Sequence, residues 1–321
     1  MQTAESFHTQ ALERLYEVLL PLLIISRAMD LATISSFKRI GMGSFATVFV
    51  SEGRGGVVLK QIQDPCKDAV AMLMKEHDDL LTLNSVCGGS SQFFQLPRAH
   101  GSYTDYYSFA QEVGIQRTED MGLPPHALYV MQRIWPVSHW LATSIRDLFL
   151  PQPFRDQPPP QLLARLYLGN GTSRQGSRFV NTENFPLSAD RIERLGLPAD
   201  KIAAGMGQML ASINFKAGRD GRDIEFVLCG HPENPLSKVP FYECIDFNQM
   251  RPHGGSAIVI VSSMVSNDPY YPRPWSPQWQ AFADAYLATA AEANESPLAH
   301  DVLQKVQSHW EEKNCHSVQL C

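Results

Sequence analysis

The chain has 321 residues, of which 44% are hydrophobic and 19% are charged, and it contains 22 prolines. That length suits one large two-lobed domain or two average ones, and the composition is typical of a soluble globular protein with many loops. The formal net charge of -6 excludes a general electrostatic attraction to nucleic acid and argues against DNA as a partner, although a local basic strip is compatible with it.

The first 34 residues are predicted to form a helical extension. Apolar residues recur at spacings of three and four from Leu12 to Leu22. The apolar run Leu15–Ile25 is interrupted by Glu17 and Pro21 and is too short to span a bilayer. Because no basic leader precedes it, we expect a cytoplasmic protein without a membrane partner.

The six cysteines are scattered and form no C-x-x-C pair. His231 and His316 lie near two of them, but nothing completes a four-ligand zinc pattern. We therefore expect reduced thiols and no metal site. The cysteines are Cys66, Cys87, Cys229, Cys244, Cys315 and Cys321.

Residues 35–135 are predicted to form a sheet-rich lobe. The segment Phe37–Val50 alternates and carries glycines, a glycine-rich turn follows, and Val57–Ile62 is typical of a strand, which together predict a hairpin. Residues 68–84 have the apolar spacing of a helix, and Ala127–Ile134 is typical of a short apolar strand.

Residues 136–321 are predicted to form a mainly helical lobe that ends in C-terminal helices. Residues 151–160 are rich in proline, and they and residues 169–177 are expected to be loops. The predicted elements are a helix at 189–216 broken near Gly196–Pro198, strands at Ile224–Leu228 and Phe241–Asp246, and a helix at Gln278–Ala291.

Four elements in chain order carry the functional prediction. The first is the turn Gly41-Met-Gly43-Ser-Phe-Ala46, since glycines between strands let the backbone approach a phosphate closely. The second and third are Lys60 on the next strand and Glu76 on the following helix, at a spacing suited to an ion pair that fixes the lysine. Each feature by itself is equally typical of a plain hairpin turn, a solvated lysine or a surface glutamate.

The fourth element is a pair of acidic stretches late in the chain. Asp220-Gly-Arg-Asp223-Ile-Glu225 leads into one strand, and Asp246-Phe-Asn248 ends the next. This is the layout of a kinase catalytic loop and metal-binding loop. The four elements in this order predict an α+β protein with a two-lobed, protein-kinase-like fold, in which the N-lobe has an antiparallel sheet and the C-lobe is mainly helical.

The sequence departs from a working phosphotransferase in several places. Such a loop reads H-R-D-x-x-x-x-N, but no histidine precedes Asp220, Glu225 stands at the asparagine position, and no Ala-Pro-Glu sequence follows. Asn248 replaces the glycine after Asp-Phe. The acidic residues of the fourth element are expected to form a dense cluster, which can bind Mg²⁺ or an organic cation such as a guanidinium or ammonium group.

Five stretches of the sequence point to one family. They are Arg39-Ile-Gly-Met-Gly43, Asn184-Phe-Pro-Leu187, Asp220-x-x-Asp-x-Glu-Phe-Val-Leu228, Asp246-Phe247 and Asn267-Asp-Pro-Tyr-Tyr-Pro-Arg-Pro274. Over residues 36–290 they resemble a fungal family of kinase-like proteins and, within it, the arginine-containing cyclodipeptide synthases.

That resemblance implies an enzyme of secondary-metabolite biosynthesis. It would join arginine to a second amino acid, both delivered as aminoacyl-tRNA, and close a diketopiperazine. The family has an acidic motif important for activity, to which the resemblance assigns the catalytic residues Asp220, Asp223 and Glu225. The expected substrate-binding residues are Gly41, Gly43, Lys60, Glu76 and Asp246.

Physical chemistry agrees with part of this expectation. Carboxylates recognise a guanidinium by paired hydrogen bonds, and one carboxylate can take the proton from an α-amino group before it attacks an ester. An aminoacyl ester is already activated, so no cofactor is required.

The expected partners are aminoacyl-tRNAs, including arginyl-tRNA, although the acidic net charge argues against a polyanion. A run of arginines could supply a local basic surface, and a solvated basic stretch is the alternative explanation for them. These residues are Arg165, Arg174, Arg178, Arg191 and Arg194.

Two other functions stay open at this point. One is a phosphotransferase, which would need ATP and Mg²⁺ and in which Glu225 replaces the asparagine as a metal ligand. The other is a binding-only pseudokinase that holds a partner through the acidic residues or through the Pro-Tyr-rich segment after Asn267.

Overall fold

The computed structural model describes residues 36–51, 56–87, 92–113, 115, 123–169, 184–234 and 236–318, with side chains up to residue 314. The chain divides into two compact units, which are described separately. The first unit contains residues up to Asp78 and Arg98–Arg133, and the second contains Asp79–Pro97 and the residues from Ile134 onward. Residues 79–97, which the sequence predicts within the sheet-rich lobe, group with the second unit.

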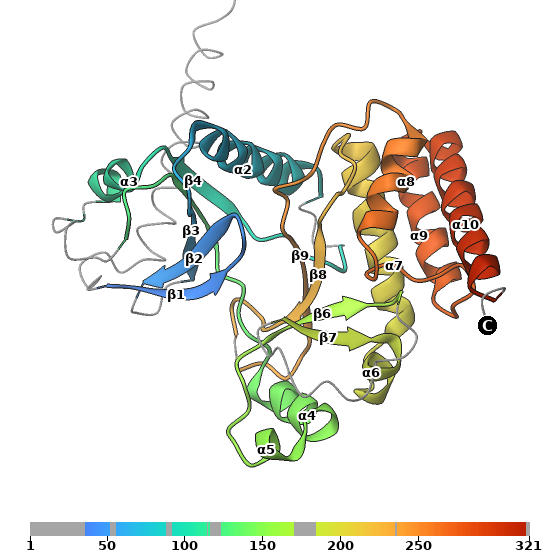
Figure 1. Ribbon diagram of the computed structural model, residues 1–321, viewed down its shortest axis with the longest axis horizontal. Coiled ribbons are helices and arrows are strands. Elements are labelled where there is room, and N and C mark those ends of the chain that lie inside the picture. Colours follow the sequence, from blue (N-terminus) through green and yellow to red (C-terminus); the bar gives the residue numbers. More distant parts are fainter. Residues whose placement is uncertain are drawn as a thin grey trace, which may run out of the picture. The chain divides into compact units, whose positions relative to one another are not determined.

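An antiparallel five-stranded sheet organises the first unit (Figure 1). Its strands are β1 (Phe37–Met42), β2 (Ala46–Ser51), β3 (Val57–Ile62), β4 (Ala99–Tyr103) and β5 (Leu128–Gln132), in the order β1-β2-β3-β5-β4. The central strand β3 is buried at every position except Lys60, as expected for an apolar, β-branched sequence between two neighbours. Helix α3 (Tyr106–Val113) contributes Tyr106 and Phe109 to a core shared with Leu128 and Val130 of β5.

Helix α2 (Lys67–Cys87) follows β3 and confirms the helix predicted at 68–84. Its buried positions Leu73, Glu76, Leu80 and Leu83 recur at spacings of three and four, so they lie on one side of the helix. The residues up to Asp78 belong to the first unit and the remainder to the second.

A mixed four-stranded sheet organises the second unit. Its strands are β6 (Leu163–Tyr167), β7 (Asn184–Ser188), β8 (Glu225–Cys229) and β9 (Phe241–Ile245), in the order β7-β6-β8-β9. Strands β6 and β7 are parallel, whereas β8 is antiparallel to both β6 and β9. Phe226 of β8 and Tyr242 of β9 pack with Phe94 in an aromatic cluster.

The register of this sheet decides which polar side chains share a face. Arg165 is opposite Val227, Val227 is opposite Glu243, and Glu225 is opposite Ile245. Directly opposed residues in an antiparallel pair point to the same face, and positions two apart on a strand do so as well. Arg165, Glu225 and Glu243 therefore lie on one face of the sheet.

Helices make up the rest of the second unit, and α7, α8, α9 and α10 lie together in Figure 1. The helices are α4 (His139–Phe149), α5 (Gln152–Arg155), α6 (Ala189–Arg194), α7 (Ala199–Ala211), the π-helix η2 (Ser212–Lys216), α8 (Ala257–Ser266), α9 (Trp279–Glu292) and α10 (Ser296–Val318). Helix α7 packs closely on α9 because Gly207 has no side chain: a Cβ atom there would lie 2.2 Å from the carbonyl oxygen of Phe282.

The α+β class and the antiparallel sheet predicted from the sequence are confirmed. The predicted loop at 151–160 was wrong in part, because Gln152–Arg155 form the short helix α5. The predicted N-terminal extension at 1–34 and nearly all of the loop at 169–177 lie outside the described residues. None of the helices among the described residues is long and apolar enough to cross a membrane.

Candidate functional site

Lys60 and Glu76 form an ion pair within the first unit. Lys60 lies on β3, opposite Val48 of β2 and Tyr129 of β5, and its Nζ is 2.5 Å from Oε1 of Glu76 on α2. The side chain of Glu76 is 1% exposed and that of Lys60 is 13% exposed. A buried pair of this kind loses much of its stability when one partner is removed, because the remaining charge stays desolvated.

The turn between β1 and β2 carries Gly41 and Gly43. The Gly43 amide donates to the Ala46 carbonyl at 2.9 Å, and the Gln63 side-chain amide donates to the Gly43 carbonyl at 2.7 Å. Neither glycine has a left-handed φ, and a Cβ atom at either would meet its neighbours only at ordinary contact distance. The fold of this turn therefore does not require glycine, and the close approach of a phosphate to it stays a prediction.

In the second unit, Asp220 faces into its own loop. Its side chain is buried, and Oδ1 accepts hydrogen bonds from the backbone amides of Arg222 at 3.1 Å and Arg251 at 2.9 Å. The hydroxyl of Ser263 on α8 donates to the Asp220 carbonyl at 2.6 Å. These contacts tie the loop to α8 and to Arg251, so in this arrangement the Asp220 side chain holds the loop together.

The same loop contains several left-handed residues. Gly218, Gly221 and Asp223 have φ values of 67°, 70° and 64°, and Asp246 at the end of β9 has φ 63°. Asn267 accepts from the Asp223 amide at 2.7 Å and donates to the Gly221 carbonyl at 2.9 Å, which holds this conformation. Non-glycine residues in the left-handed region cost about 1–3 kcal/mol each and cluster at functional sites.

Glu225 is paired with an arginine from a distant part of the chain. Arg165 on β6 places Nε at 2.9 Å and Nη2 at 2.6 Å from Oε2 of Glu225 on β8. The Glu225 side chain is 15% exposed and that of Arg165 is 23% exposed. Both contacts use Oε2, and no partner is assigned to Oε1 among the residues that the structure describes.

The electrostatics of this pair are set by burial and by neighbouring carboxylates. Burial raises the pKa of the Glu225 carboxyl to about 7, the charges of Asp246 and Asp223 contribute to the rise, and Arg165 opposes it. The Asp223 carboxylate also accepts a hydrogen bond from Gln249 at 2.6 Å. A carboxyl that is about half ionised near neutral pH can both accept and return a proton.

Two tyrosines complete the surroundings of the pair. The rings of Tyr167 and Tyr270 pack edge to face with centroids 4.9 Å apart, and both lie within electrostatic range of Arg165. Burial raises the pKa of Tyr270, with a further contribution from the charge of Glu225. We call Arg165, Asp223, Glu225, Asp246 and Tyr270 the carboxylate–arginine cluster.

The predicted site residues thus form two separate groups, one in each unit. The structure brings Lys60 and Glu76 together, and separately it places Asp223 and Asp246 near Glu225. Asp220 belongs to the same loop but is turned toward backbone amides. Sequence reasoning did not pair Arg165 with Glu225, and only the strand register, which places Arg165 beside β8, could have indicated that contact.

A second ion pair was also missed. Arg219, directly before Asp220, places Nη2 at 2.7 Å from Oδ1 of Asp79, whose side chain is 2% exposed. The Asn214 side chain donates to the Arg219 carbonyl at 2.8 Å, so this residue is held on both sides.

The described arginines that were expected to supply a local basic surface each have a contact within the protein, and the basic surface itself stays a prediction. Arg165 is paired with Glu225, while Arg191 stacks on Phe149 and Phe185 at 5.2 and 5.1 Å from the ring centroids. Arg194 stacks on Phe149 as well, at 4.8 Å. Arg174 and Arg178 lie outside the described residues.

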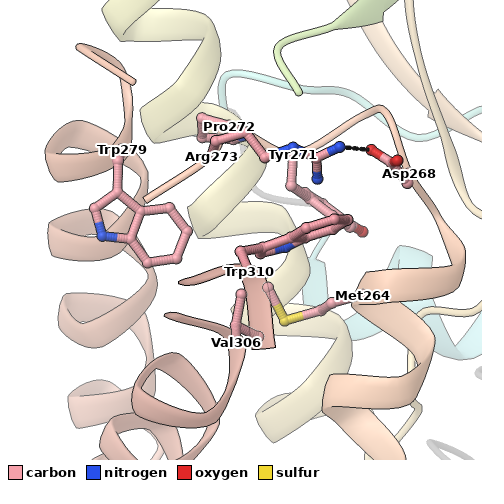
Figure 2. A pocket seen from close by; sticks show the side chains of 8 residues that line it. All are labelled: Met264, Asp268, Tyr271, Pro272, Arg273, Trp279, Val306 and Trp310. Atoms are coloured by element: carbon pink, nitrogen blue, oxygen red, sulfur yellow. Dashed lines mark hydrogen bonds and ion pairs between the residues drawn. The ribbon is translucent and has the colours of Figure 1, made fainter. Parts of the chain in front are cut away.

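A narrow pocket lies between helices of the second unit, and two of its lining residues, Asp268 and Tyr271, are close in sequence to Tyr270 of the cluster (Figure 2). Arg273 lies over the ring of Trp310, 3.5 Å from its centroid, and forms an ion pair with Asp268. The pocket is lined by Met264, Asp268, Tyr271, Pro272, Arg273, Trp279, Val306 and Trp310. Its two charged side chains are paired with each other, so we assign no ligand to it.

The comparison with protein families gives one match to part of the chain. Residues 243–297 match a family model described as DUF3669, zinc finger protein. The match covers less than a fifth of the chain, so it does not assign the whole chain to that family. A search of curated proteins found no match.

The residues in the matched segment do not fit a zinc finger. Residues 243–297 contain one cysteine, Cys244, and one histidine, His253. Cys244 is fully buried, and both ring nitrogens of His253 lie within hydrogen-bond distance of backbone atoms of Asn214 and Gly255. A structural zinc site takes four cysteine or histidine ligands, and no group of three metal-binding side chains occurs in the part of the chain that the structure describes.

The family match also corrects an expectation from the sequence. The predicted membership of a fungal kinase-like family, and of the arginine-containing cyclodipeptide synthases within it, was wrong, because the family that matches is described as zinc finger protein. The shared stretches that suggested it are short, and short loop and strand motifs recur in unrelated proteins.

Proposed function

We propose that the chain is an aminoacyl-tRNA-dependent enzyme that joins arginine to a second amino acid and closes a cyclic dipeptide. We propose further that its two units form a protein-kinase-like fold. This proposal is drawn from the chemistry of the carboxylate–arginine cluster and from the elements that carry it, and not from family membership.

Two features of the first unit support the kinase-like fold. Its antiparallel sheet carries a lysine on the third strand, and the helix that follows carries the glutamate that pairs with that lysine at 2.5 Å. This is the lysine–glutamate arrangement on which kinases rely. In the second unit, β8 and β9 follow a loop rich in left-handed residues, and Asp246 comes directly after β9, in the order of a catalytic loop and an Asp-Phe loop.

The environment of Glu225 carries the functional proposal. A buried carboxyl with a pKa of about 7 is suited to take a proton from an amine at neutral pH. The same carboxyl contacts the guanidinium of Arg165 through Nε and Nη2. A guanidinium group therefore already lies against this carboxylate in the structure, as an arginine substrate would have to. Asp223 and Asp246 add negative potential, which favours a cationic substrate.

The reaction needs no cofactor. The α-amino nitrogen of one aminoacyl ester attacks the ester carbonyl carbon of the other, so that an N–C bond forms and the C–O bond to the tRNA ribose breaks. Glu225 Oε1 accepts the amine proton and returns it to the departing ribose oxygen. A second attack of the same kind closes the ring and releases the second tRNA.

Product analysis tests this proposal directly. Purified protein is incubated with arginyl-tRNA and a mixture of other aminoacyl-tRNAs, and cyclic arginyl dipeptides are measured by mass spectrometry. We expect product from the wild type and about 100-fold less from Glu225→Gln, because the amide cannot take up the proton. Glu233→Gln, an exposed position in the loop between β8 and β9, is the matched control. Folded wild-type protein that yields no cyclic dipeptide would exclude this function.

The pair of Lys60 and Glu76 favours a second candidate, an ATP-dependent phosphotransferase. In kinases this pair positions the nucleotide phosphates. The test is thermal unfolding with and without ATP and Mg²⁺, for the wild type and Lys60→Met. A nucleotide-dependent shift that Lys60→Met removes would support this candidate. Absence of any shift, together with absence of a cyclic dipeptide, would leave a binding-only protein.

A further inference from the structure

Glu243 is a buried carboxyl in the middle of β9 that the proposed reaction does not use. Its side chain is 2% exposed, and Oε2 is buried with no hydrogen-bond partner among the described residues. An ionised carboxylate in such a place loses its hydration without compensation, so the neutral form is strongly favoured.

Among the residues that the structure describes, the groups around Glu243 offer no compensating charge. On β8, Val227 lies directly opposite, and Cys229 and Glu225 lie on the same face two positions away on either side. On β6, Arg165 of that face is engaged with Glu225, and in the segment beside β9, Gln95 contacts Glu243 through a backbone bridge. Burial raises the pKa of the Cys229 thiol, and the charge of Glu243 contributes to the rise.

The position of Glu243 in the hairpin gives it influence over the carboxylate–arginine cluster. β8 begins at Glu225, and β9 ends at Ile245, directly before Asp246. Two cluster residues are therefore held by the same two-stranded ladder that contains Glu243. A change that loosens the ladder would move both.

We propose that Glu243 is a pH-sensitive lock on the β8–β9 hairpin: the hairpin keeps its geometry while Glu243 holds a proton and loosens when the proton leaves. Burial raises the pKa of this carboxyl from 4.5 to about 8, which places the transition just above neutral pH. The lock acts whatever substrate the cluster binds, so it stands independently of the proposed function.

The direction of the effect follows from proton linkage. The unfolded chain releases the Glu243 proton near pH 4.5, whereas the folded chain keeps it until about pH 8. Between these limits the folded state binds one more proton, so its stability falls as the pH rises, and the loss is complete above the folded pKa. This single proton changes the unfolding equilibrium constant by about tenfold per pH unit.

Glu243→Gln tests the lock, with Glu233→Gln in the same hairpin as the matched control. Urea unfolding is measured between about pH 5 and pH 9, and hydrogen exchange of the β8 and β9 amides, corrected for the intrinsic rate, at the two ends of that range. We expect Glu243→Gln to match the wild type near pH 5, to gain about tenfold in folding equilibrium constant relative to the wild type per pH unit up to about pH 8, and to gain no more above it. Its hairpin amides should stay protected at high pH, where those of the wild type and of Glu233→Gln exchange faster.

A second measurement tests the proposal if Glu243→Gln fails to fold. The infrared spectrum of the wild type should show the carbonyl band of a protonated carboxyl that remains after Glu225 has ionised near pH 7 and disappears as the pH rises past about 8. Glu243→Met, which fills the same space without a charge, should lack the band and fold stably at high pH. The same pH dependence of stability in the wild type and both Glu243 variants, or a band unaffected by the Glu243→Met change, would overturn the proposal.

Discussion

At the scale of single residues, the ion pair of Arg165 and Glu225 is the contact on which the proposed reaction depends. It joins β6 to β8 across 60 residues of sequence, and both side chains are mostly buried. Removing one side chain leaves the charge of the other buried without a partner, whereas removing both leaves no unpaired charge.

A double-mutant cycle measures this coupling. Because both side chains keep some exposure, we expect Arg165→Met to cost about 2 kcal/mol in the free energy of unfolding, less than for a fully buried pair. Arg165→Met combined with Glu225→Gln should recover most of that loss in urea unfolding near neutral pH. Additive costs in the double variant would show that the two side chains do not interact.

The pH dependence of activity depends on the same residue. If Glu225 is the base, the rate of cyclic dipeptide formation should rise through about pH 7, since the base must be ionised, and should level off only up to about pH 8, where the hairpin that holds Glu225 begins to loosen. Arg165 lowers the pKa of Glu225, so Arg165→Met should move the midpoint of the rate profile to higher pH. A midpoint that stays in place in this variant would assign the profile to the substrate amine instead.

At the scale of elements, the contact between α7 and α9 depends on the absence of one side chain. A Cβ atom at Gly207 would lie 2.2 Å from the Phe282 carbonyl oxygen, which belongs to the backbone and cannot rotate away. Gly207→Ala should therefore destabilise the second unit by about 3 kcal/mol or prevent its folding. Gly56→Ala, where a Cβ atom meets nothing within 4 Å, is the control. Similar unfolding midpoints for the two variants would contradict the close packing of these helices.

At the scale of the whole molecule, the prediction concerns metal. The matched segment is described by the words zinc finger, yet it holds a single cysteine and a single histidine, both committed to the fold. We expect treatment with a chelator to leave the thermal unfolding midpoint unchanged, whereas a domain folded around zinc unfolds when the metal is removed. Stoichiometric zinc in the purified protein, with unfolding on chelation, would contradict this.

Much of the secondary structure could be predicted, because periodicity is a local property. The alternation around Lys60, the helical spacing around Glu76 and the two strands that flank the loop at 230–240 all appear where the sequence placed them. The strands β6 and β7 were missed because Leu163–Tyr167 and Asn184–Ser188 pair with each other in parallel, which requires a long connection rather than a turn with its own sequence signal.

The sequence by itself determined which residues have the chemistry to act: it identified Lys60 with Glu76 and the acidic residues Asp223, Glu225 and Asp246. The tertiary structure decided their surroundings, because it buried Glu225 beside Arg165 and turned Asp220 toward backbone amides. It also left Oε2 of Glu243 buried without a hydrogen-bond partner among the described residues. The physical reason is that hydrophobic periodicity repeats over a few residues, whereas desolvation and charge pairing depend on side chains brought together from distant parts of the chain.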